Sequence, residues 1–186
     1  VLPLGKVKIT RKVKSLLIIF RTNTSVEIWD QNKKRLFEYP KIEYATRSLN
    51  SLIKSIKFLR QQLPEINIKL IILDDHSSKE NLEKIKKISE REKSSEIISL
   101  DHKKYESLIK EQKSNETFSN LSSLLNSFEI GKNQGDDLVF FVEDDYLHFE
   151  TMLEEMLLSF QRISSQLKKD LFMCPSDYPY LYMNNE

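Results

Sequence analysis

The chain has 186 residues, of which 39% are hydrophobic and 31% are charged, with 29 basic and 28 acidic side chains. This composition provides enough apolar material for one core and too much for an intrinsically disordered chain. The formal net charge of +1 gives no basic excess to neutralise phosphates, which argues against nucleic acid as a partner. We therefore expect one domain over residues 1–186.

The single cysteine, Cys174, excludes an intrachain disulfide framework, favours a reducing, cytoplasmic location, and is expected to be a buried small hydrophobe. The apolar run at 16–20 is far shorter than the ~20 residues that span a bilayer, and residues 1–4 do not resemble a signal peptide. The first residue is not Met, and the chain stops soon after a strand-like stretch at 171–174. We therefore expect a fragment that is open at both ends.

Taken in chain order, continuous apolar runs alternate with segments in which apolar residues recur at helical spacing. Runs typical of buried strands lie at 15–21, 68–73, 96–100 and 138–142, and a fifth begins at 171. Apolar residues at helical spacing predict helices at about 43–62, 79–92, 118–130 and 152–160. Residues 26–29 and 35–39 flank a polar stretch and predict a small hairpin or a loop insertion. The alternation predicts an α/β fold with a mainly parallel sheet and helices on both faces.

Glycine is rare, since only Gly5, Gly131 and Gly135 occur. No glycine-rich loop follows a predicted strand, which argues against a P-loop NTPase and against a Rossmann dinucleotide site. Ligands of open parallel sheets bind outside the carboxyl ends of the strands. The polar residues at the predicted strand ends are therefore the candidates for function.

The strand at 138–142 is followed by the acidic triplet Glu143-Asp144-Asp145. Adjacent carboxylates at the end of a buried strand are costly without a counter-charge. Carboxylate oxygens and a diphosphate together make a hard site that suits Mg²⁺ or Mn²⁺. A solvated acidic turn is the alternative interpretation.

The other two strand ends carry weaker signals. Residues 74–78, Asp-Asp-His-Ser-Ser, offer carboxylates that can accept from a nucleobase N–H or a ribose hydroxyl. A turn in which Ser78 caps the next helix explains the same residues. The first strand ends in Arg21, Thr22 and Asn23. Arg21 suits a phosphate or an acidic cluster, and the following two residues either hold the loop or contact a base.

In combination, these three strand ends resemble the motifs of family 2-type glycosyltransferases with the GT-A fold, over roughly residues 15–160. In that family the second strand ends in Asp-Asp-Gly-Ser or a close variant, and a later strand ends in Asp-X-Asp. The resemblance implies a metal-dependent enzyme that binds a nucleoside-diphosphate sugar, usually a UDP-sugar. The sugar would pass to a hydroxyl of a glycan, a lipid-linked or a small-molecule acceptor, in the cytoplasm or peripherally at the cytoplasmic membrane face.

The same resemblance assigns roles to individual residues. Asp75 is expected to contact the nucleobase, and Asp144 to lie near the ribose. Asp145 is expected to coordinate the Mn²⁺ or Mg²⁺ that bridges the diphosphate, while Glu143 binds the metal through water or tunes the site. The remaining nucleotide-binding candidates are Arg21, Thr22, Asn23 and, on the helix before the metal motif, Asn120.

Several features depart from the family pattern. His76 replaces the usual glycine of the second motif, and we expect it and His102 to be surface residues. His148 is a weaker candidate for the metal shell, with a loop or helix-start histidine as the alternative. The family's catalytic base is a carboxylate far downstream, in an acceptor-binding half, and we do not expect Asp177 to be that base. We therefore expect a chain that is truncated at its C-terminus and lacks the base.

Three alternatives remain open. An inactive GT-A-like module would bind only a nucleotide or a partner. A receiver-like Mg²⁺-binding signalling domain needs a phosphoacceptor Asp on a middle strand and a Lys at the end of a late strand, whereas the late strand here ends in Met173-Cys174-Pro175. A nucleotidyltransferase normally carries a glycine-rich loop after its first strand, which this chain lacks.

Overall fold

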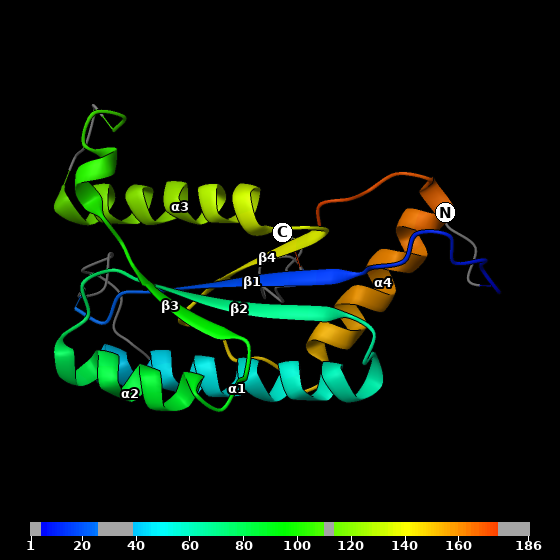
Figure 1. The fold of residues 1–186 in the computed structure, drawn as a ribbon, viewed down its shortest axis with the longest axis horizontal. Helices are drawn as coiled ribbons and strands as arrows, with labels where there is room; N and C mark the ends of the chain where they lie inside the picture. The colour runs from blue at the N-terminus through cyan, green and yellow to red at the C-terminus, as the bar shows by residue number, and fades with distance from the viewer. Residues whose placement is uncertain (1–4, 26–38, 110–113, 175–186) are drawn as a thin grey trace, which may run out of the picture.

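Four strands form one sheet in the computed structural model, which describes residues 5–25, 39–109 and 114–174. The strands are β1 (Ser15–Thr22), β2 (Asn67–Asp74), β3 (Ser95–Ser99) and β4 (Leu138–Glu143). Their order in the sheet is β3-β2-β1-β4, and every pair is parallel (Figure 1). The predicted parallel sheet is therefore confirmed over the described part of the chain.

Helices lie on both faces of this sheet, as predicted. They are α1 (Lys41–Gln62), α2 (Lys79–Ser89), α3 (Asn115–Gln134), α4 (Met152–Leu167) and the short 3-10 helix η2 (His102–Tyr105). Helix α1 packs beside α2 and α4 on one face, and α3 and η2 lie on the other (Figure 1). The result is a Rossmann-like α/β arrangement. None of the described helices has an apolar stretch of the length that a bilayer requires.

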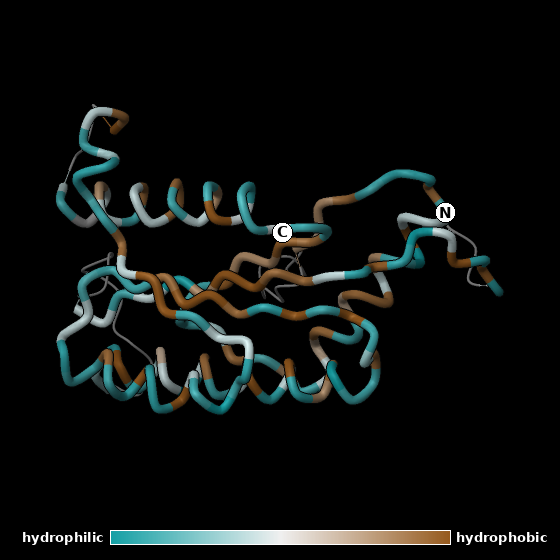
Figure 2. Tube along the Cα trace, viewed as in Figure 1, coloured by the Kyte–Doolittle hydropathy of each residue, from teal (hydrophilic) through white to brown (hydrophobic). Residues whose placement is uncertain are grey.

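The apolar run of β1 has no polar alternation because both of its faces are covered. Leu16, Ile18 and Phe20 belong to the core under α1, α2 and α4, whereas Leu17 and Ile19 belong to the core under α3. As Figure 2 shows, the hydrophobic colour is concentrated in the strands, and the helices alternate between hydrophobic and hydrophilic turns. Continuous apolar sequence is what a central parallel strand requires.

Local signals set several helix boundaries. Ser78 Oγ accepts a hydrogen bond from the backbone N–H of Asn81 at 3.2 Å, which confirms its predicted role as the cap of α2. Ser114 Oγ caps α3 in the same way, by accepting from the N–H of Thr117 at 3.3 Å. Helix α3 therefore begins at Asn115, before the first apolar residue that predicted it.

Two expectations at the end of the chain are wrong. No strand forms at 171–174 within the described residues, and Cys174 is exposed rather than buried. Leu171 and Met173 are each partly buried against the core, while Phe172 between them is fully exposed. This alternation imitates a strand although no described strand pairs with the segment. The predicted hairpin at 26–29 and 35–39 lies, apart from Tyr39, outside the described residues.

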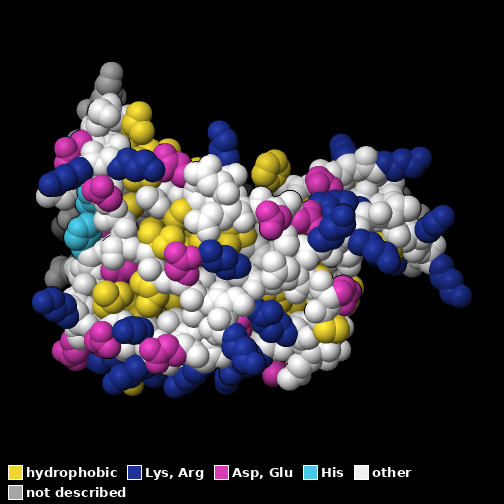
Figure 3. Space-filling view, in the orientation of Figure 1, with side chains coloured by type: hydrophobic (Ala, Val, Ile, Leu, Met, Phe, Trp, Pro, Cys, Tyr) yellow, Lys and Arg dark blue, Asp and Glu magenta, His cyan; other side chains and the backbone are white. Residues whose placement is uncertain are grey.

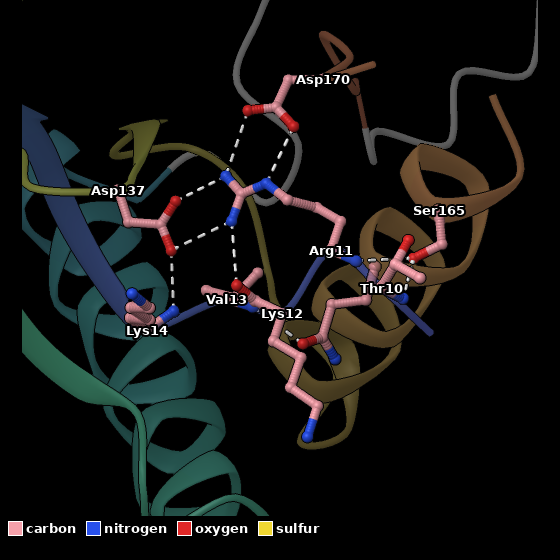
Figure 4. Close-up of polar contacts among 9 residues, drawn as sticks. Thr10, Arg11, Lys12, Val13, Lys14, Asp137, Ser165 and Asp170 are labelled. Atoms are coloured by element: carbon pink, nitrogen blue, oxygen red, sulfur yellow. Dashed lines mark hydrogen bonds and ion pairs between the residues drawn. The ribbon is translucent and has the colours of Figure 1, made fainter. Parts of the chain in front are cut away.

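An arginine ties together three segments at the amino end of the sheet. Figure 4 shows the Arg11 guanidinium between Asp137 and Asp170, with N···O distances of 2.5 and 2.8 Å. The backbone N–H of Lys14 also donates to Asp137, at 2.7 Å. Burial alone raises the pKa of the Asp137 carboxyl, but the hydrogen bonds from Arg11 and Lys14 outweigh burial and hold this pKa below its ordinary value.

Replacement of Asp137 by Asn tests this contact. We expect Asp137→Asn to lower the free energy of unfolding at pH 7 by about 1–3 kcal/mol, because Arg11 loses a partly buried charged partner. The pKa of Asp137 is depressed in the folded state, so its contribution exists above its unfolded pKa and disappears as pH falls through the folded value. Urea unfolding at pH 7 and at about pH 3 measures both effects. The role assigned to Asp137 would be contradicted if Asp137→Asn lowers the free energy of unfolding by the same amount at both pH values. An equal decrease in the exposed control Asp136→Asn would also contradict it.

Candidate functional site

The ends of β1, β2 and β4 bring the predicted strand-end residues together. Thr22 Oγ1 donates to Asp144 Oδ2 at 2.8 Å, and the backbone N–H of Asn23 donates to the same oxygen at 3.3 Å. The side-chain amide of Asn23 donates to Asp75 Oδ2 at 3.1 Å. The loop after β1 therefore links the motif after β2 to the motif after β4. We call the surface formed by Arg21–Asn23, Asp75, Asn120 and Glu143–Asp145 the carboxyl edge.

Asp144 is the buried carboxylate of the acidic triplet, with 6% of its surface exposed. Its second oxygen, Oδ1, lies 2.5 Å from the Nζ atom of Lys41, the first residue of α1. A buried carboxylate needs such a counter-charge, and here a lysine supplies it. The sequence analysis missed Lys41, since nothing local connects residue 41 with residue 144.

Arg21 reaches the acidic triplet from the neighbouring strand. Its Nη2 atom forms an ion pair with the Glu143 carboxylate, and its Nη1 atom donates to Asn120 Oδ1 at 3.3 Å. A phosphate and an acidic cluster were the two partners predicted for Arg21, and in the structure Arg21 contacts the acidic cluster. The Arg21 side chain is 12% exposed and that of Glu143 is 52% exposed, so the carboxylate side of this ion pair faces solvent.

Asp145 differs from the two residues before it. Its side chain is exposed, and it forms no hydrogen bond or ion pair with any described residue. An exposed carboxylate at this position can take a cation, although the triplet does not gather three metal-binding side chains among the described residues. Water and the oxygens of a diphosphate would have to complete the coordination of an ion held here.

Asp75 is the centre of a second polar group. Its side chain is 3% exposed, and its Oδ2 atom accepts from Asn23 and from the hydroxyl of Ser119 on α3. Its other oxygen, Oδ1, lies 2.8 Å from His76 Nδ1 and 2.8 Å from His102 Nε2. Both histidines are partly exposed, as expected of surface residues, but both rings face Asp75. In Figure 3 the histidine side chains form a patch beside acidic ones at the end of the molecule where the strands terminate.

His76 adopts a backbone conformation that glycine normally occupies. Its φ angle is 57°, in the left-handed region, which costs a non-glycine residue roughly 1–2 kcal/mol. The hydroxyl of Ser25 donates to the His76 carbonyl at 2.9 Å and helps to hold the turn. The turn after β2 therefore has the conformation favoured by the glycine that family 2-type glycosyltransferases carry, with an imidazole added at the carboxyl edge.

His148 does not join either group. Its backbone N–H donates to Ser51 Oγ on α1 at 3.0 Å, and its ring nitrogen Nε2 is buried without a hydrogen-bond partner among the described residues. Burial lowers the pKa of His148 to about 4. The structure therefore favours a packed loop histidine over the metal ligand.

A scan against protein-family models, a search of curated proteins and a search of solved structures each find no match for this chain. The family resemblance rests on the three strand-end motifs, of which the first is hydrogen-bonded to each of the other two.

The buried imidazole of His148 predicts a pH effect on stability. Its pKa is depressed in the folded state, so its contribution is complete above the unfolded pKa of about 6.5 and is lost as pH falls toward about 4. We expect the free energy of unfolding of His148→Leu at pH 7 to lie within about 1 kcal/mol of that of the original chain. The substitution removes a ring nitrogen that has no hydrogen-bond partner among the described residues. Urea unfolding between these two pH values should show a flatter pH dependence for the variant. An unchanged pH dependence would contradict the assignment.

Proposed function

We propose that the carboxyl edge binds a nucleoside-diphosphate sugar, in the first instance a UDP-sugar, together with Mn²⁺ or Mg²⁺, and that the chain is the donor-binding part of a GT-A-type glycosyltransferase. The observation that carries the proposal is the position of Asn23. Its backbone contacts Asp144 and its side chain contacts Asp75, so three motifs far apart in sequence form one polar surface. Polar groups at the carboxyl ends of parallel strands are the usual ligand-binding groups of such folds.

The diphosphate would lie between Arg21 and Asp145. Phosphate oxygens form bidentate, charge-assisted bonds with a guanidinium, and they can replace the exposed Glu143 as the partner of Arg21. The exposed carboxylate of Asp145 would hold the metal ion against the same phosphates. Charge neutralisation by the ion and the guanidinium would stabilise the diphosphate as it leaves the sugar.

The nucleoside would lie over the loop after β1, toward Asp75 and Asn120. A base N–H would take the place of one of the two donors that now occupy Asp75 Oδ2. Asp144, which is held by Thr22, Asn23 and Lys41, would fix this loop beside the ribose. In this arrangement Asp144 acts by position, and Asp75 contacts the ligand directly.

Transfer to an acceptor hydroxyl also requires a general base. We assign this role to none of the described residues, and we propose that an acceptor-binding part of the protein supplies it. The acceptor would be a glycan, a lipid-linked or a small-molecule alcohol, encountered in the cytoplasm or at the cytoplasmic face of a membrane. Donor binding is then the property of this chain that can be measured directly.

Calorimetric titration of UDP with and without Mn²⁺ tests donor binding. We expect saturable, Mn²⁺-dependent binding that weakens at least about tenfold in Asp145→Asn, because this carboxylate is the exposed metal ligand. The exposed Asp136→Asn serves as a control for loss of one negative charge and should bind as the original chain does. Absence of UDP binding by the folded chain, or equal binding by Asp145→Asn, would contradict the proposal.

The role of Arg21 predicts a difference between ligands. Arg21→Gln removes the charge but keeps a polar side chain, so it should weaken UDP binding about 10- to 100-fold, the range expected for a hydrogen bond between charged groups. Binding of uridine, which lacks phosphates, should change little. Titration of both ligands measures the ratio, and an equal loss for UDP and uridine would show that Arg21 does not contact the phosphates.

A further inference from the structure

Two histidines and one aspartate converge where β2 and β3 end. One ligand atom from each of Asp75, His76 and His102 lies within 4.8 Å of the other two, and the two imidazole rings have centroids 4.6 Å apart. Both nearest ring nitrogens approach the same carboxylate oxygen, Asp75 Oδ1, at 2.8 Å. The proposed nucleotide site uses the other oxygen, Oδ2. The two histidines therefore have no role in the function proposed above, and Asp75 would serve it through its other oxygen.

The sheet determines this meeting of side chains. Strands β2 and β3 are parallel neighbours, and the backbone N–H of Leu100 donates to the Asp74 carbonyl at 2.8 Å. The chain segments that follow the two strands must therefore leave the sheet side by side, one carrying His76 and the other His102. Helix η2 is itself anchored, because the fully buried Tyr105 donates its hydroxyl to Glu129 on α3 at 2.7 Å.

Protein atoms alone leave one nitrogen of this group unsatisfied. His102 Nε2 is buried, and although it lies 2.8 Å from Asp75 Oδ1, it has no hydrogen bond with a described residue. A buried polar atom without a hydrogen-bond partner is destabilising. His76 also retains its left-handed backbone conformation, which brings its ring onto the same oxygen. An ion coordinated by all three atoms would give the nitrogen of His102 its missing partner.

We propose that Asp75 Oδ1, His76 Nδ1 and His102 Nε2 bind a divalent transition-metal ion, with Zn²⁺ as the representative ion. Two imidazoles and one carboxylate suit Zn²⁺, Co²⁺, Ni²⁺ or Fe²⁺, whereas Mg²⁺ and Ca²⁺ prefer oxygen ligands. This site is separate from the Mg²⁺ or Mn²⁺ position at Asp145, and its ligand set selects a different class of ion.

The distances suit an ion after a small adjustment. Ligands at the usual Zn–N and Zn–O lengths are ~3.3 Å apart in a tetrahedron, so each 2.8 Å contact must open by ~0.5 Å. The His76 side chain is 64% exposed and free to make this movement. The second oxygen of Asp75 is held by Asn23 and Ser119, which orients the carboxylate in the way that outer hydrogen bonds orient metal ligands. Three protein ligands leave a fourth position to water or to a substrate atom.

The chain suits a direct test because it contains three histidines, and His148 lies outside the group. We would use tag-free protein carrying Cys174→Ser, which removes the exposed thiol as a competing ligand. Zn²⁺ titration followed by nitrogen–proton spectra of the imidazoles should show one equivalent bound, with two rings shifted and the third unchanged. Mg²⁺ should shift none. No saturable Zn²⁺ binding, or a shift of the His148 ring, would overturn the proposal.

Variants give a second readout that does not depend on the spectra. His76→Gly removes the imidazole and suits the left-handed backbone, and His102→Gln keeps a polar side chain of similar length. Each substitution should weaken Zn²⁺ binding at least about tenfold. Loss of a residue that only orients a ligand weakens metal binding about 10- to 100-fold, and loss of a direct ligand should cost at least as much. His148→Leu is the matched control and should bind Zn²⁺ unchanged. Full Zn²⁺ binding by the double variant His76→Gly, His102→Gln would overturn the proposal.

The two proposed metal positions can fail independently. Asp145→Asn should retain Zn²⁺ binding, and His76→Gly should retain Mn²⁺-dependent binding of UDP. If the chain without these substitutions binds Zn²⁺ but does not bind UDP, the transferase proposal alone is rejected. If Asp145→Asn abolishes Zn²⁺ binding, the ion lies at the acidic triplet and the histidine site is rejected.

Discussion

The candidate site depends on one constraint, the register of the parallel strands, which places their carboxyl ends side by side. Thr22 lies opposite Asp74, Arg21 opposite Glu143, and Asp74 opposite Ser99, so four strand ends finish at the same edge. The backbone N–H of Asp75 then donates to the Thr22 carbonyl at 2.8 Å, which extends the ladder into the loops. Carboxylates that follow the strands are thereby brought together, and each must find a donor or a cation. The loop after β1, Lys41 and the two histidines provide these partners.

The carboxylates of the edge divide into two kinds by their surroundings. Asp75 and Asp144 are buried, and protein groups lie within 3.1 Å of both oxygens of each. Asp144 holds the loop after β1, whereas Asp75 is the proposed contact for the base. Glu143 and Asp145 are exposed. Glu143 forms an ion pair with Arg21, whereas Asp145 has no partner among the described residues. A ligand can engage the exposed pair without breaking the fold. This division supports phosphate and metal binding at Arg21 and Asp145, with Asp144 holding the loop beside them.

How much the sequence predicted depended on the range of the interactions involved. The β1 strand followed from an unbroken apolar run, and the meeting of the three motifs followed from the parallel order of the strands. Arg11 and Lys41 were missed because their partners, Asp137 and Asp144, are more than 100 residues away and no local pattern marks them. His102 was missed as a metal-ligand candidate because the residue it approaches, Asp75, follows the neighbouring strand β2. The strand predicted from 171 failed because alternate burial against helices and the sheet core has the same period as a strand.

The central claim is that one nucleotide occupies the loops after β1, β2 and β4 together. Backbone amide spectra of the chain, recorded during titration with UDP and Mg²⁺, test it most directly because they locate the ligand without any substitution. We expect the largest shifts at 21–23, 75–77 and 143–145, three segments that are separate in sequence and adjacent in the fold. Shifts confined to one segment, or located at the amino end of the sheet around Arg11, would contradict it.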